Sequence, residues 1–276
     1  MKYLDLEGAI KKSSSKLLKK LPGFVVKLII RIVKQDRINQ ILTKHSESIG
    51  IDFLPKMIEE FNLTLVIEGI ENLPENGRCI FAANHPFGVI DGLVITRIIS
   101  QKYGTVKGIG NDAFLYIPHL RPIIAAVNAF GQSSKEYISA LDAVFDSDEP
   151  ITHFPAGEVS RIYSWKVQDC KWQKSMITKA VSKKRDIVPI HFYGRNSRLF
   201  YSVGLIRMLL RIKLNLELML LPREMLRKQD QTIRVRIGKP IPYQKFDSTL
   251  NHWDWAQRVR KHVYDLGKSK DGKVEF

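Results

Sequence analysis

Two short segments of the chain combine polar side chains with turn-forming residues, and their residue types are those of an active site. Residues 84–91 read Asn-His-Pro-Phe-Gly-Val-Ile-Asp, and residues 154–161 read Phe-Pro-Ala-Gly-Glu-Val-Ser-Arg. Each follows an apolar run typical of a buried strand, and Pro and Gly then end that run. The two segments therefore predict loops that carry functional side chains at the ends of strands.

His85 and Asp91 supply the parts needed for general base catalysis. A neutral imidazole accepts a proton from an alcohol near pH 7, and a neighbouring carboxylate fixes its tautomer and stabilises the imidazolium that forms. Six positions correspond to about 600° of rotation on a regular helix, so on one helix the two side chains would face different directions. Pro86 and Gly88 instead predict a turn, followed by a helix that begins near Val89. His85 would then lie just before a helix N-terminus, whose free N–H groups favour an oxyanion or a phosphate.

A structural interpretation of the same pair is that His85 packs beside a turn and Asp91 only favours the start of the helix. A lone His/Asp pair supports that interpretation, because such spacings are common by chance. The second segment, residues 154–161, favours the catalytic interpretation.

Both segments resemble motifs of the glycerolipid (lysophospholipid) acyltransferase family, which includes 1-acylglycerol-3-phosphate acyltransferases. The family's first motif is His, four residues and Asp, whereas five residues separate His85 from Asp91. Its third motif, usually Phe-Pro-Glu-Gly-Thr-Arg, corresponds to residues 154–161. Both have the form of the hemolysin-like or ornithine-lipid-type branch. Because residues 106–131 and 187–190 resemble the second and fourth motifs, the resemblance covers roughly residues 60–240.

The resemblance implies a bacterial O-acyltransferase of membrane lipid biosynthesis. His85 would act as general base on a hydroxyl of the lipid acceptor, and Asp91 would orient it. The hydroxyl oxygen would attack the thioester carbonyl of acyl-ACP (acyl carrier protein) or acyl-CoA, which are co-substrates, so no cofactor and no covalent acyl-enzyme are expected. Oxyanion stabilisation is expected from backbone N–H groups near Gly88 or Gly157. The alternative is a membrane-surface lipid-binding protein that kept the fold without turnover.

Further residues of the motifs would bind substrate. Arg161 could grip a phosphate or a carboxylate through a bidentate contact, with a surface ion pair as its alternative. Lys107 could bind an anionic group, or be a solvated lysine at a strand end. The residues expected to bind substrate are Asn84, Gly88, Lys107, Phe154, Pro155, Gly157, Glu158 and Arg161.

One departure from the family pattern bears on the acceptor. The commoner motif has Glu before the Gly, whereas Ala156 stands there and Glu158 follows the Gly. We therefore expect different headgroup contacts. Both a lysophospholipid and an N-acyl amino acid lipid with a free hydroxyl remain candidate acceptors.

The charge of the chain indicates an anionic partner. Lys and Arg number 44 against 28 Asp and Glu, which gives a formal net charge of +16 over 276 residues. Such a surplus favours either nucleic acid or an anionic lipid surface. Zinc-finger spacing, an RNA-recognition aromatic signature and a Gly-rich phosphate loop are all missing from the sequence, so nucleic acid is not expected as a partner.

A basic and apolar stretch near the N-terminus predicts contact with that lipid surface. In residues 16–34, Lys27, Arg31 and Lys34 recur at helical spacing, and they interrupt the apolar run before it reaches the roughly 20 residues of a spanning helix. Such a helix can lie in the membrane interface. The alternative is a helix that packs on the core and keeps its lysines in water. Residues 205–213 could extend the membrane surface or form an ordinary amphipathic helix beside the sheet.

Cysteine and histidine patterns narrow the remaining possibilities. Cys79 and Cys170 are the two cysteines, which does not suggest a disulfide framework and fits a reducing compartment. Paired-Cys and His-Glu-x-x-His patterns are absent from the sequence, so no catalytic metal is expected. The first residues do not read as a signal peptide. We expect a peripheral or monotopic protein at the cytoplasmic face of the inner (cell) membrane.

The alternation of strand and helix patterns predicts an α/β fold with a single mixed, largely parallel sheet flanked by helices. Its sites should lie where strands end. Residues 1–60 are expected to form an N-terminal amphipathic helical segment that associates with the membrane, 61–267 the acyltransferase domain, and 268–276 a flexible tail. Predicted strands cover residues 63–68, 79–83, 105–109, 151–154, 187–192, 214–220 and 233–237. Predicted helices cover residues 90–101, a segment between 109 and 135, 135–145, 173–183 and 253–266.

Overall fold

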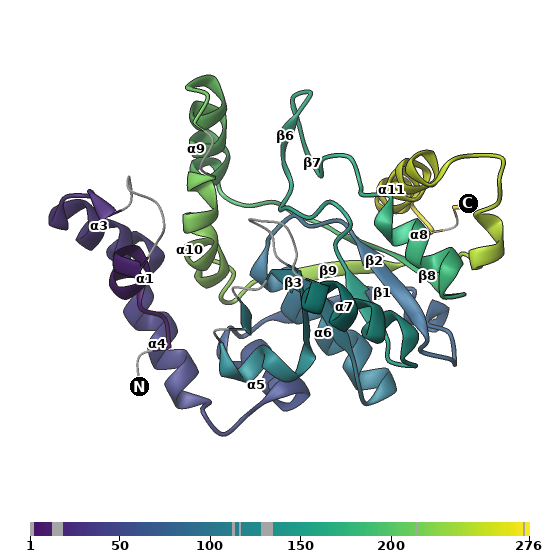
Figure 1. Ribbon diagram of the computed structural model, residues 1–276, viewed down its shortest axis with the longest axis horizontal. Coiled ribbons are helices and arrows are strands. Elements are labelled where there is room, and N and C mark those ends of the chain that lie inside the picture. The colour runs from purple at the N-terminus through teal and green to yellow at the C-terminus, as the bar shows by residue number, and fades with distance from the viewer. Residues whose placement is uncertain are drawn as a thin grey trace.

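A seven-stranded sheet forms the centre of the computed structural model, which describes residues 3–12, 19–111, 114–115, 117–127, 135–212, 215–272 and 274–276. Its strand order is β1-β9-β8-β2-β5-β3-β4 (Figure 1). The bounds are β1 (Thr64–Glu68), β2 (Cys79–Ala83), β3 (Lys107–Asn111), β4 (Ile124–Val127), β5 (Ile151–His153), β8 (Asp186–Phe192) and β9 (Thr232–Ile237). Neighbouring strands are parallel except for β8 and β9, which are antiparallel, so the predicted mixed, largely parallel sheet is confirmed.

The central strands are apolar because helices cover both faces of the sheet. All five residues of β2 are buried, as a strand in the middle of a parallel sheet requires. Phe81 points into a core shared with α5 (Phe53–Glu60) and α6 (Val89–Tyr103). Ile80 and Ala82 point into the opposite core, which α8 (Ser175–Ser182) and α11 (His252–Lys268) complete.

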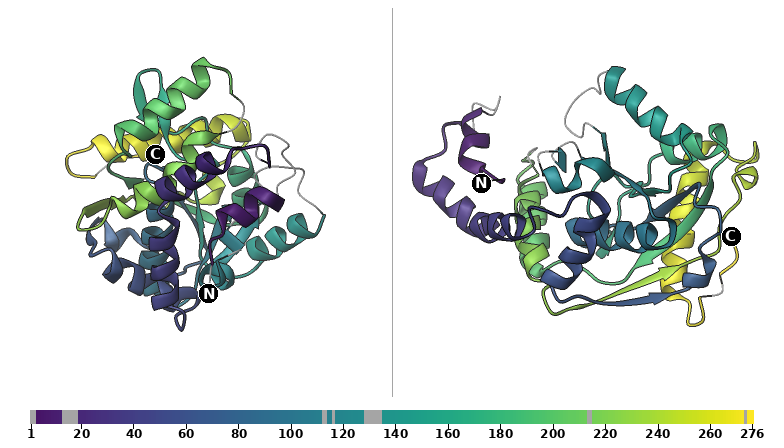
Figure 2. Two further views of the ribbon diagram at one scale, coloured as in Figure 1. Left: turned by 90° about the vertical axis from the view of Figure 1, so that its left-hand side faces the viewer. Right: turned by 90° about the horizontal axis from the view of Figure 1, so that it is seen from below.

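A second group of helices lies beside this body. Figures 1 and 2 show α1 (Leu6–Lys12), α3 (Gly23–Val33) and α4 (Gln35–Lys44) next to α9 (Arg198–Leu209) and α10 (Leu221–Leu226). The helix α3 contacts α10 and the 3-10 helix η5 (Leu216–Leu220). A hairpin of β6 (Arg161–Tyr163) and β7 (Lys166–Gln168) projects from the second motif segment, and α7 (Lys135–Asp146) packs on β4. Among the helices of the described residues, none has both the length and the apolar character that a membrane span requires.

The strand predicted at 214–220 is wrong. Its described part is residues 215–220, of which 216–220 form η5, and α10 follows directly with a proline in its first turn. Alternating leucines fit a strand, but Glu217 and Leu220 are the buried residues here, a spacing of three that suits a 3-10 helix. Packing against α3 and α9 therefore overrides the local pattern.

The other predictions hold with small shifts or fall partly outside the described residues. The predicted helix between 109 and 135 contains instead the 3-10 helix η4 (Pro118–Ile123) and β4, whose four-residue apolar run is too short to distinguish strand from helix. The strand predicted at 105–109 begins two residues later, as β3. Residues 16–18, 131, 213 and 214 lie outside the described part of the chain.

The division into a helical segment, a domain and a tail stays a prediction. Two observations bear on it. The helix α5, inside the predicted segment 1–60, packs on α6 of the main body. In the predicted tail, the Phe276 ring lies 6.0 Å from that of Phe246 and 6.1 Å from that of Trp255, measured between centroids.

Candidate active site

The two motif segments leave the sheet side by side. The strands β2 and β5 are parallel neighbours in which Ala82 pairs with His153, so residues 84–91 and 154–161 emerge at the same edge. There the His85 ring stacks on Phe154, with 3.9 Å between ring centroids and 21° between planes. The meeting of distant segments at one edge is the arrangement that parallel strands impose on a site.

His85 and Asp91 form a hydrogen-bonded pair. Nδ1 of His85 lies 2.9 Å from Oδ2 of Asp91. The same carboxylate oxygen accepts from the backbone N–H groups of Phe87 (2.8 Å) and Gly88 (2.9 Å). Asp91 is fully buried, whereas the His85 side chain is 16% exposed. With Nδ1–H donated to Asp91, the lone pair is on Nε2, the nitrogen that can accept a proton from a substrate.

The turn between the pair depends on Gly88. Its φ of 92° lies in a region that other residues rarely adopt, and a Cβ there would come within 2.9 Å of the Leu221 side chain. The helix α6 starts at Val89, so Asp91 is its third residue and caps the first turn from within. The predicted turn and helix start are confirmed.

The amides of the two motif glycines are already engaged. Gly88 N–H donates to Asp91, and Gly157 N–H donates to the Phe154 carbonyl at 3.0 Å. Both bonds close turns of the site loops. The oxyanion would therefore have to be stabilised by backbone N–H groups of residues near these two glycines, and this stays a prediction.

Asp169 is a second buried carboxylate beside His85, and the sequence did not point to it. One of its oxygens accepts from His85 N–H (3.1 Å) and from the Ser160 hydroxyl (2.5 Å), and the other accepts from Trp172 Nε1 (2.9 Å). Burial raises the pKa of Asp169 above its ordinary value, against the effect of the donors from Ser160 and Trp172. The main chain closes the network, because Ser160 N–H donates to His85 C=O at 2.8 Å.

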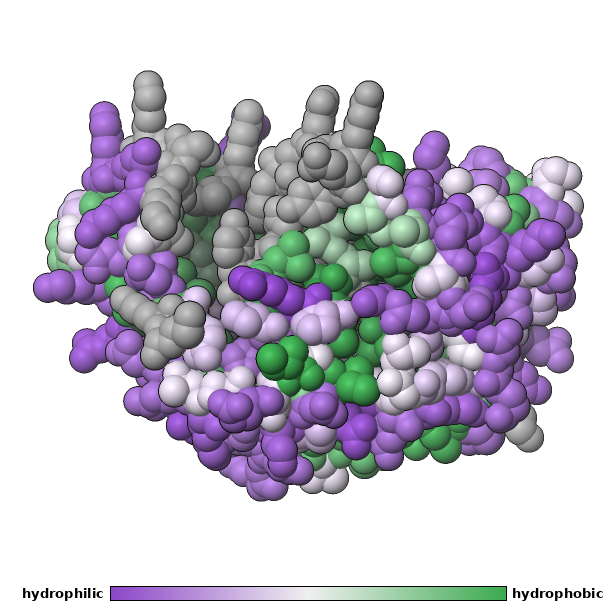
Figure 3. Space-filling model, turned by 60° about the horizontal axis from the view of Figure 1, so that its bottom comes forward, coloured by the Kyte–Doolittle hydropathy of each residue, from purple (hydrophilic) through white to green (hydrophobic). Residues whose placement is uncertain are grey.

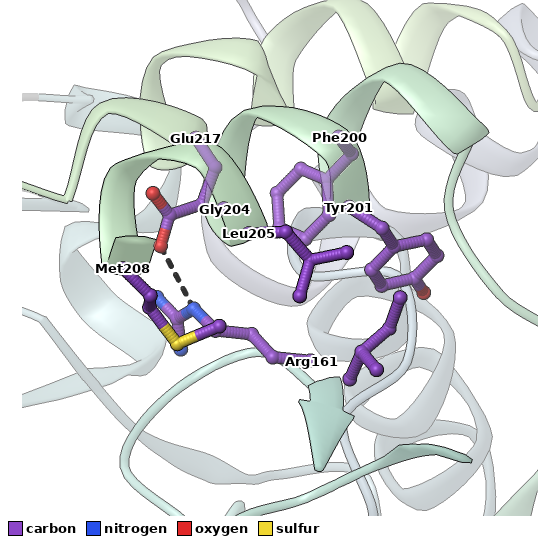
Figure 4. A pocket seen from close by; sticks show the side chains of 8 residues that line it. Arg161, Phe200, Tyr201, Gly204, Leu205, Met208 and Glu217 are labelled. Atoms are coloured by element: carbon purple, nitrogen blue, oxygen red, sulfur yellow. Dashed lines mark hydrogen bonds and ion pairs between the residues drawn. The ribbon is translucent and has the colours of Figure 1, made fainter. Parts of the chain in front are cut away.

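Arg161 is buried and paired with carboxylates, which rules out the surface ion pair. Its Nε donates to Glu217 at 2.8 Å (Figure 4). Its Nη1 forms an ion pair with Glu158. Nε of Arg207 lies 2.9 Å from the other oxygen of Glu217, which is fully buried. Burial opposes the charge of Arg161, but Glu158 and Glu217 outweigh it and raise the pKa of the guanidinium. Glu217 was missed because it lies in η5, which the sequence predicts as a strand.

A narrow crevice borders this charged cluster. Figure 4 shows Arg161 and Glu217 on one side and Phe200 and Tyr201 of α9 on the other. Gly204 of α9 lies between them, so the helix backbone comes close to the ion pair. The crevice is therefore polar at one end and apolar at the other.

The remaining predicted site residues have different positions. Asn84 is close to His85, but its amide exchanges hydrogen bonds with the backbone of Phe192, at 2.7 and 3.0 Å, and so ties β2 to β8. Pro155 is buried, and Glu158 accepts from the Tyr163 hydroxyl at 2.6 Å.

Lys107 is not brought to the site, in contrast to the sequence-based expectation. It begins β3 opposite Ile151, the first residue of β5, and so lies at the edge of the sheet away from His85. Its Nζ donates to the Pro122 carbonyl at 2.8 Å and lies 3.8 Å from Glu149. The position favours the alternative of a lysine at a strand end.

A pocket of about 260 Å³ opens beside the site at the end of β8. Its lining includes Asn84, Pro86 and Ser160 of the two motif segments, together with His191 and Tyr264. Burial, and then the charge of Arg236, lowers the pKa of His191 to about 4, so this imidazole is neutral at pH 7.

Comparison with known proteins gives a family match, relatives of similar sequence and a solved structure of lower similarity. The sequence profile of the family described as Acyltransferase matches residues 9–273. A lyso-glycine lipid O-acyltransferase of Phocaeicola vulgatus is 39% identical over 264 residues, which are 95% of each chain. An enzyme of the same name from Bacteroides thetaiotaomicron is 36% identical, over 95% of this chain and 97% of that one. A crystal structure of the 1-acyl-sn-glycerophosphate acyltransferase PlsC from Thermotoga maritima matches with a TM-score of 0.49 at 16% identity, over 96% of this chain and 88% of the other.

Proposed function

The chain belongs to the acyltransferase family, and we propose that it transfers a fatty acyl group from an acyl thioester to the free hydroxyl of a lyso-glycine lipid, with His85 as the base. The observation that carries the proposal is the His85–Asp91 pair at the strand edge, with Nε2 free to accept a proton. The identity of the acceptor rests on the names of the relatives.

The proposed reaction is a direct transfer. His85 Nε2 takes the proton of the acceptor hydroxyl while its oxygen attacks the thioester carbonyl. Asp91 stabilises the imidazolium that forms, as a buried carboxylate can. When the tetrahedral intermediate collapses, the C–S bond breaks and the thiolate of the carrier recovers the proton from His85. The products are an ester and a free carrier thiol.

The Arg161 cluster carries no net formal charge, because Arg161 and Arg207 meet Glu158 and Glu217. The Arg161 guanidinium is therefore engaged within the protein, and breaking such a buried pair is costly for a phosphate and for a carboxylate alike.

Exposed apolar and basic side chains support binding to an anionic membrane surface at the cytoplasmic face. On α3, Phe24 is 73% exposed and Leu28 52%, and Lys27 and Arg31 are exposed beside them. Helices with such faces bind the interface of anionic membranes. Figure 3 shows another apolar patch in the middle of one face, bordered by hydrophilic residues.

The end of α9 extends this surface. Leu209 is 82% exposed and Leu210 62%, and both α9 and α3 contact η5. Replacing Leu209 and Leu210 by Asp should weaken binding to anionic vesicles about tenfold or more in a flotation assay. Unchanged binding would exclude this helix end from the membrane contact.

The test of the function is acyl transfer from a labelled acyl thioester in anionic vesicles. Lyso-glycine lipid, an N-acyl ornithine lipid and lysophosphatidic acid serve as acceptors, with acyl-ACP and acyl-CoA as donors in separate arms. We expect transfer to lyso-glycine lipid at least about tenfold faster than to lysophosphatidic acid, a discrimination of the size that one mismatched polar contact gives. Preference for lysophosphatidic acid would contradict the acceptor, and absence of transfer with both donors would favour a lipid-binding protein without turnover.

A further inference from the structure

We propose that Asp169 is a positioning residue that holds the backbone of the catalytic His85. This inference rests on the proposed function, because it assigns a role to Asp169 only through the base. The hydrogen bond from His85 to Asp169 comes from the backbone N–H of His85, at 3.1 Å.

The need for such a residue follows from the place of His85 in the chain. The last ladder residue of β2 is Ala83, so the sheet no longer fixes the peptide groups of His85. Pro86, which follows, has no N–H to contribute. Asp169 and Ser160 take over, because one accepts His85 N–H and the other donates its own N–H to His85 C=O at 2.8 Å.

Asp169 is itself anchored to α11. Its N–H donates to the Tyr264 hydroxyl at 2.8 Å, and its carbonyl accepts from Arg260 at 2.6 Å. Arg260 also donates to the Cys170 carbonyl at 3.0 Å. The C-terminal helix thus sets the position of the carboxylate, and the carboxylate sets the position of His85.

Three donors converge on the two oxygens of this carboxylate: His85 N–H, the Ser160 hydroxyl and Trp172 Nε1–H. An ionised carboxylate accepts all three, since it has no hydrogen of its own. An amide of the same shape would turn its NH₂ group toward one of the donors. With Asn at this position, either Trp172 or the His85 backbone loses its acceptor and the loop shifts.

The displacement acts on chemistry more than on binding. A shift of about 1 Å in a reacting group costs on the order of 100-fold in rate. We expect Asp169→Asn to lower kcat 10- to 100-fold while KM for donor and acceptor changes less than twofold. Trp172→Phe removes the conflicting N–H, so Asp169→Asn/Trp172→Phe should recover at least threefold in kcat over Asp169→Asn.

The matched control is Arg185→Gln. Arg185 is fully buried and donates to the carbonyls of Phe145 and Glu149, far from the strand ends that carry the site. The Arg185→Gln variant should have a lower unfolding temperature and an unchanged kcat. This result would separate a positioning role from a general loss of stability. Assays run on full-length protein in anionic vesicles, below the unfolding temperature of each variant.

The possible outcomes distinguish a failure of the proposed acyltransferase function from a failure of the role of Asp169. Full activity of His85→Ala would overturn the proposed function. Loss of activity in His85→Ala, with kcat of Asp169→Asn within twofold of wild type, would overturn the positioning role alone. If Asp169→Asn does not fold, Ser160→Ala decides: a three- to tenfold loss in kcat at unchanged KM supports the role, and an unchanged kcat overturns it.

Discussion

Two histidine–carboxylate pairs in this molecule have nearly the same distance between their atoms, but they differ in surroundings and in the ring nitrogen involved, which is Nδ1 in His85 and Nε2 in His45. His85 lies 2.9 Å from Asp91, and His45 lies 3.1 Å from Glu60, with the two imidazoles exposed to 16% and 13%. The Asp91 carboxylate is held by backbone N–H groups at the start of α6. The Glu60 carboxylate pairs instead with the cations Lys44 and Arg37.

The difference shows that distance alone does not identify a base. Backbone dipoles fix Asp91 without cancelling its charge, so the carboxylate can stabilise an imidazolium on His85. Glu60 instead forms ion pairs with Arg37 and Lys44, two partly exposed cations that compensate its charge, and His45 is its third partner. Only the first pair also lies at the end of parallel strands, beside Phe154.

The largest expected difference comes from making each carboxylate an amide. In Asp91→Asn the amide oxygen would take the place of Oδ2, because the N–H groups of Phe87 and Gly88 both donate there. The hydrogen bond to Nδ1 of His85 would remain, but the negative charge that stabilises the imidazolium would be lost. We expect kcat to fall by about 10²- to 10⁴-fold. Glu60→Gln should leave kcat within twofold of wild type, and equal losses in the two variants would abolish the distinction. Initial rates of acyl transfer measure both.

A smaller effect is expected at the glycines that flank α6. Gly88 has φ 92° and would clash with Leu221, whereas Gly104, at the C-terminal end of the helix, has φ 73° with open space around it. Gly88→Ala should cost about 1–3 kcal/mol or more in stability and also lower kcat, because its N–H holds Asp91. Gly104→Ala should cost about 1–2 kcal/mol with kcat unchanged. Denaturant unfolding and transfer rates separate the two effects, and a fully active Gly88→Ala would contradict the role of the turn.

The smallest effect concerns the pH dependence of stability at the His45–Glu60 pair. The hydrogen bond from Lys44 is the largest influence, and with His45 it holds the pKa of Glu60 below its ordinary value despite burial. A lowered carboxyl pKa adds stability above the unfolded pKa of about 4.3, and this stability is lost as pH falls through the folded pKa. The free energy of unfolding should therefore differ between wild type and Glu60→Gln by about 1 kcal/mol at pH 7 and by less at pH 3. A difference that grows toward pH 3 would contradict this sign.

The sequence predicted those parts of the site that depend on neighbours along the chain. The turn at Pro86 and Gly88, the helix that follows and the strand before His85 all rest on local patterns, and each is present. The meeting of His85 with Phe154 also follows from the rule that parallel strands end at one edge.

What the sequence did not predict depends on contacts between distant residues. Asp169 is 84 positions from the His85 N–H that it accepts, and Glu217 is 56 positions from Arg161. The residues next to a single Asp or Glu in the sequence do not indicate which distant residue it will contact. The expectation that Lys107 lies at the site was not met for a related reason. The order of the motifs along the chain does not tell at which end of the strands a residue lies.

The most direct test of the account replaces the histidine of each pair and measures a single turnover. His85→Ala and His45→Ala are compared with wild type for acyl transfer to lyso-glycine lipid in anionic vesicles, with folding checked by thermal unfolding. Removal of the base is predicted to cost at least about 10³-fold in the first variant, and the second should stay within twofold of wild type. Transfer by His85→Ala at the wild-type rate, or an equal loss in both variants, would contradict the assignment of His85 as the base.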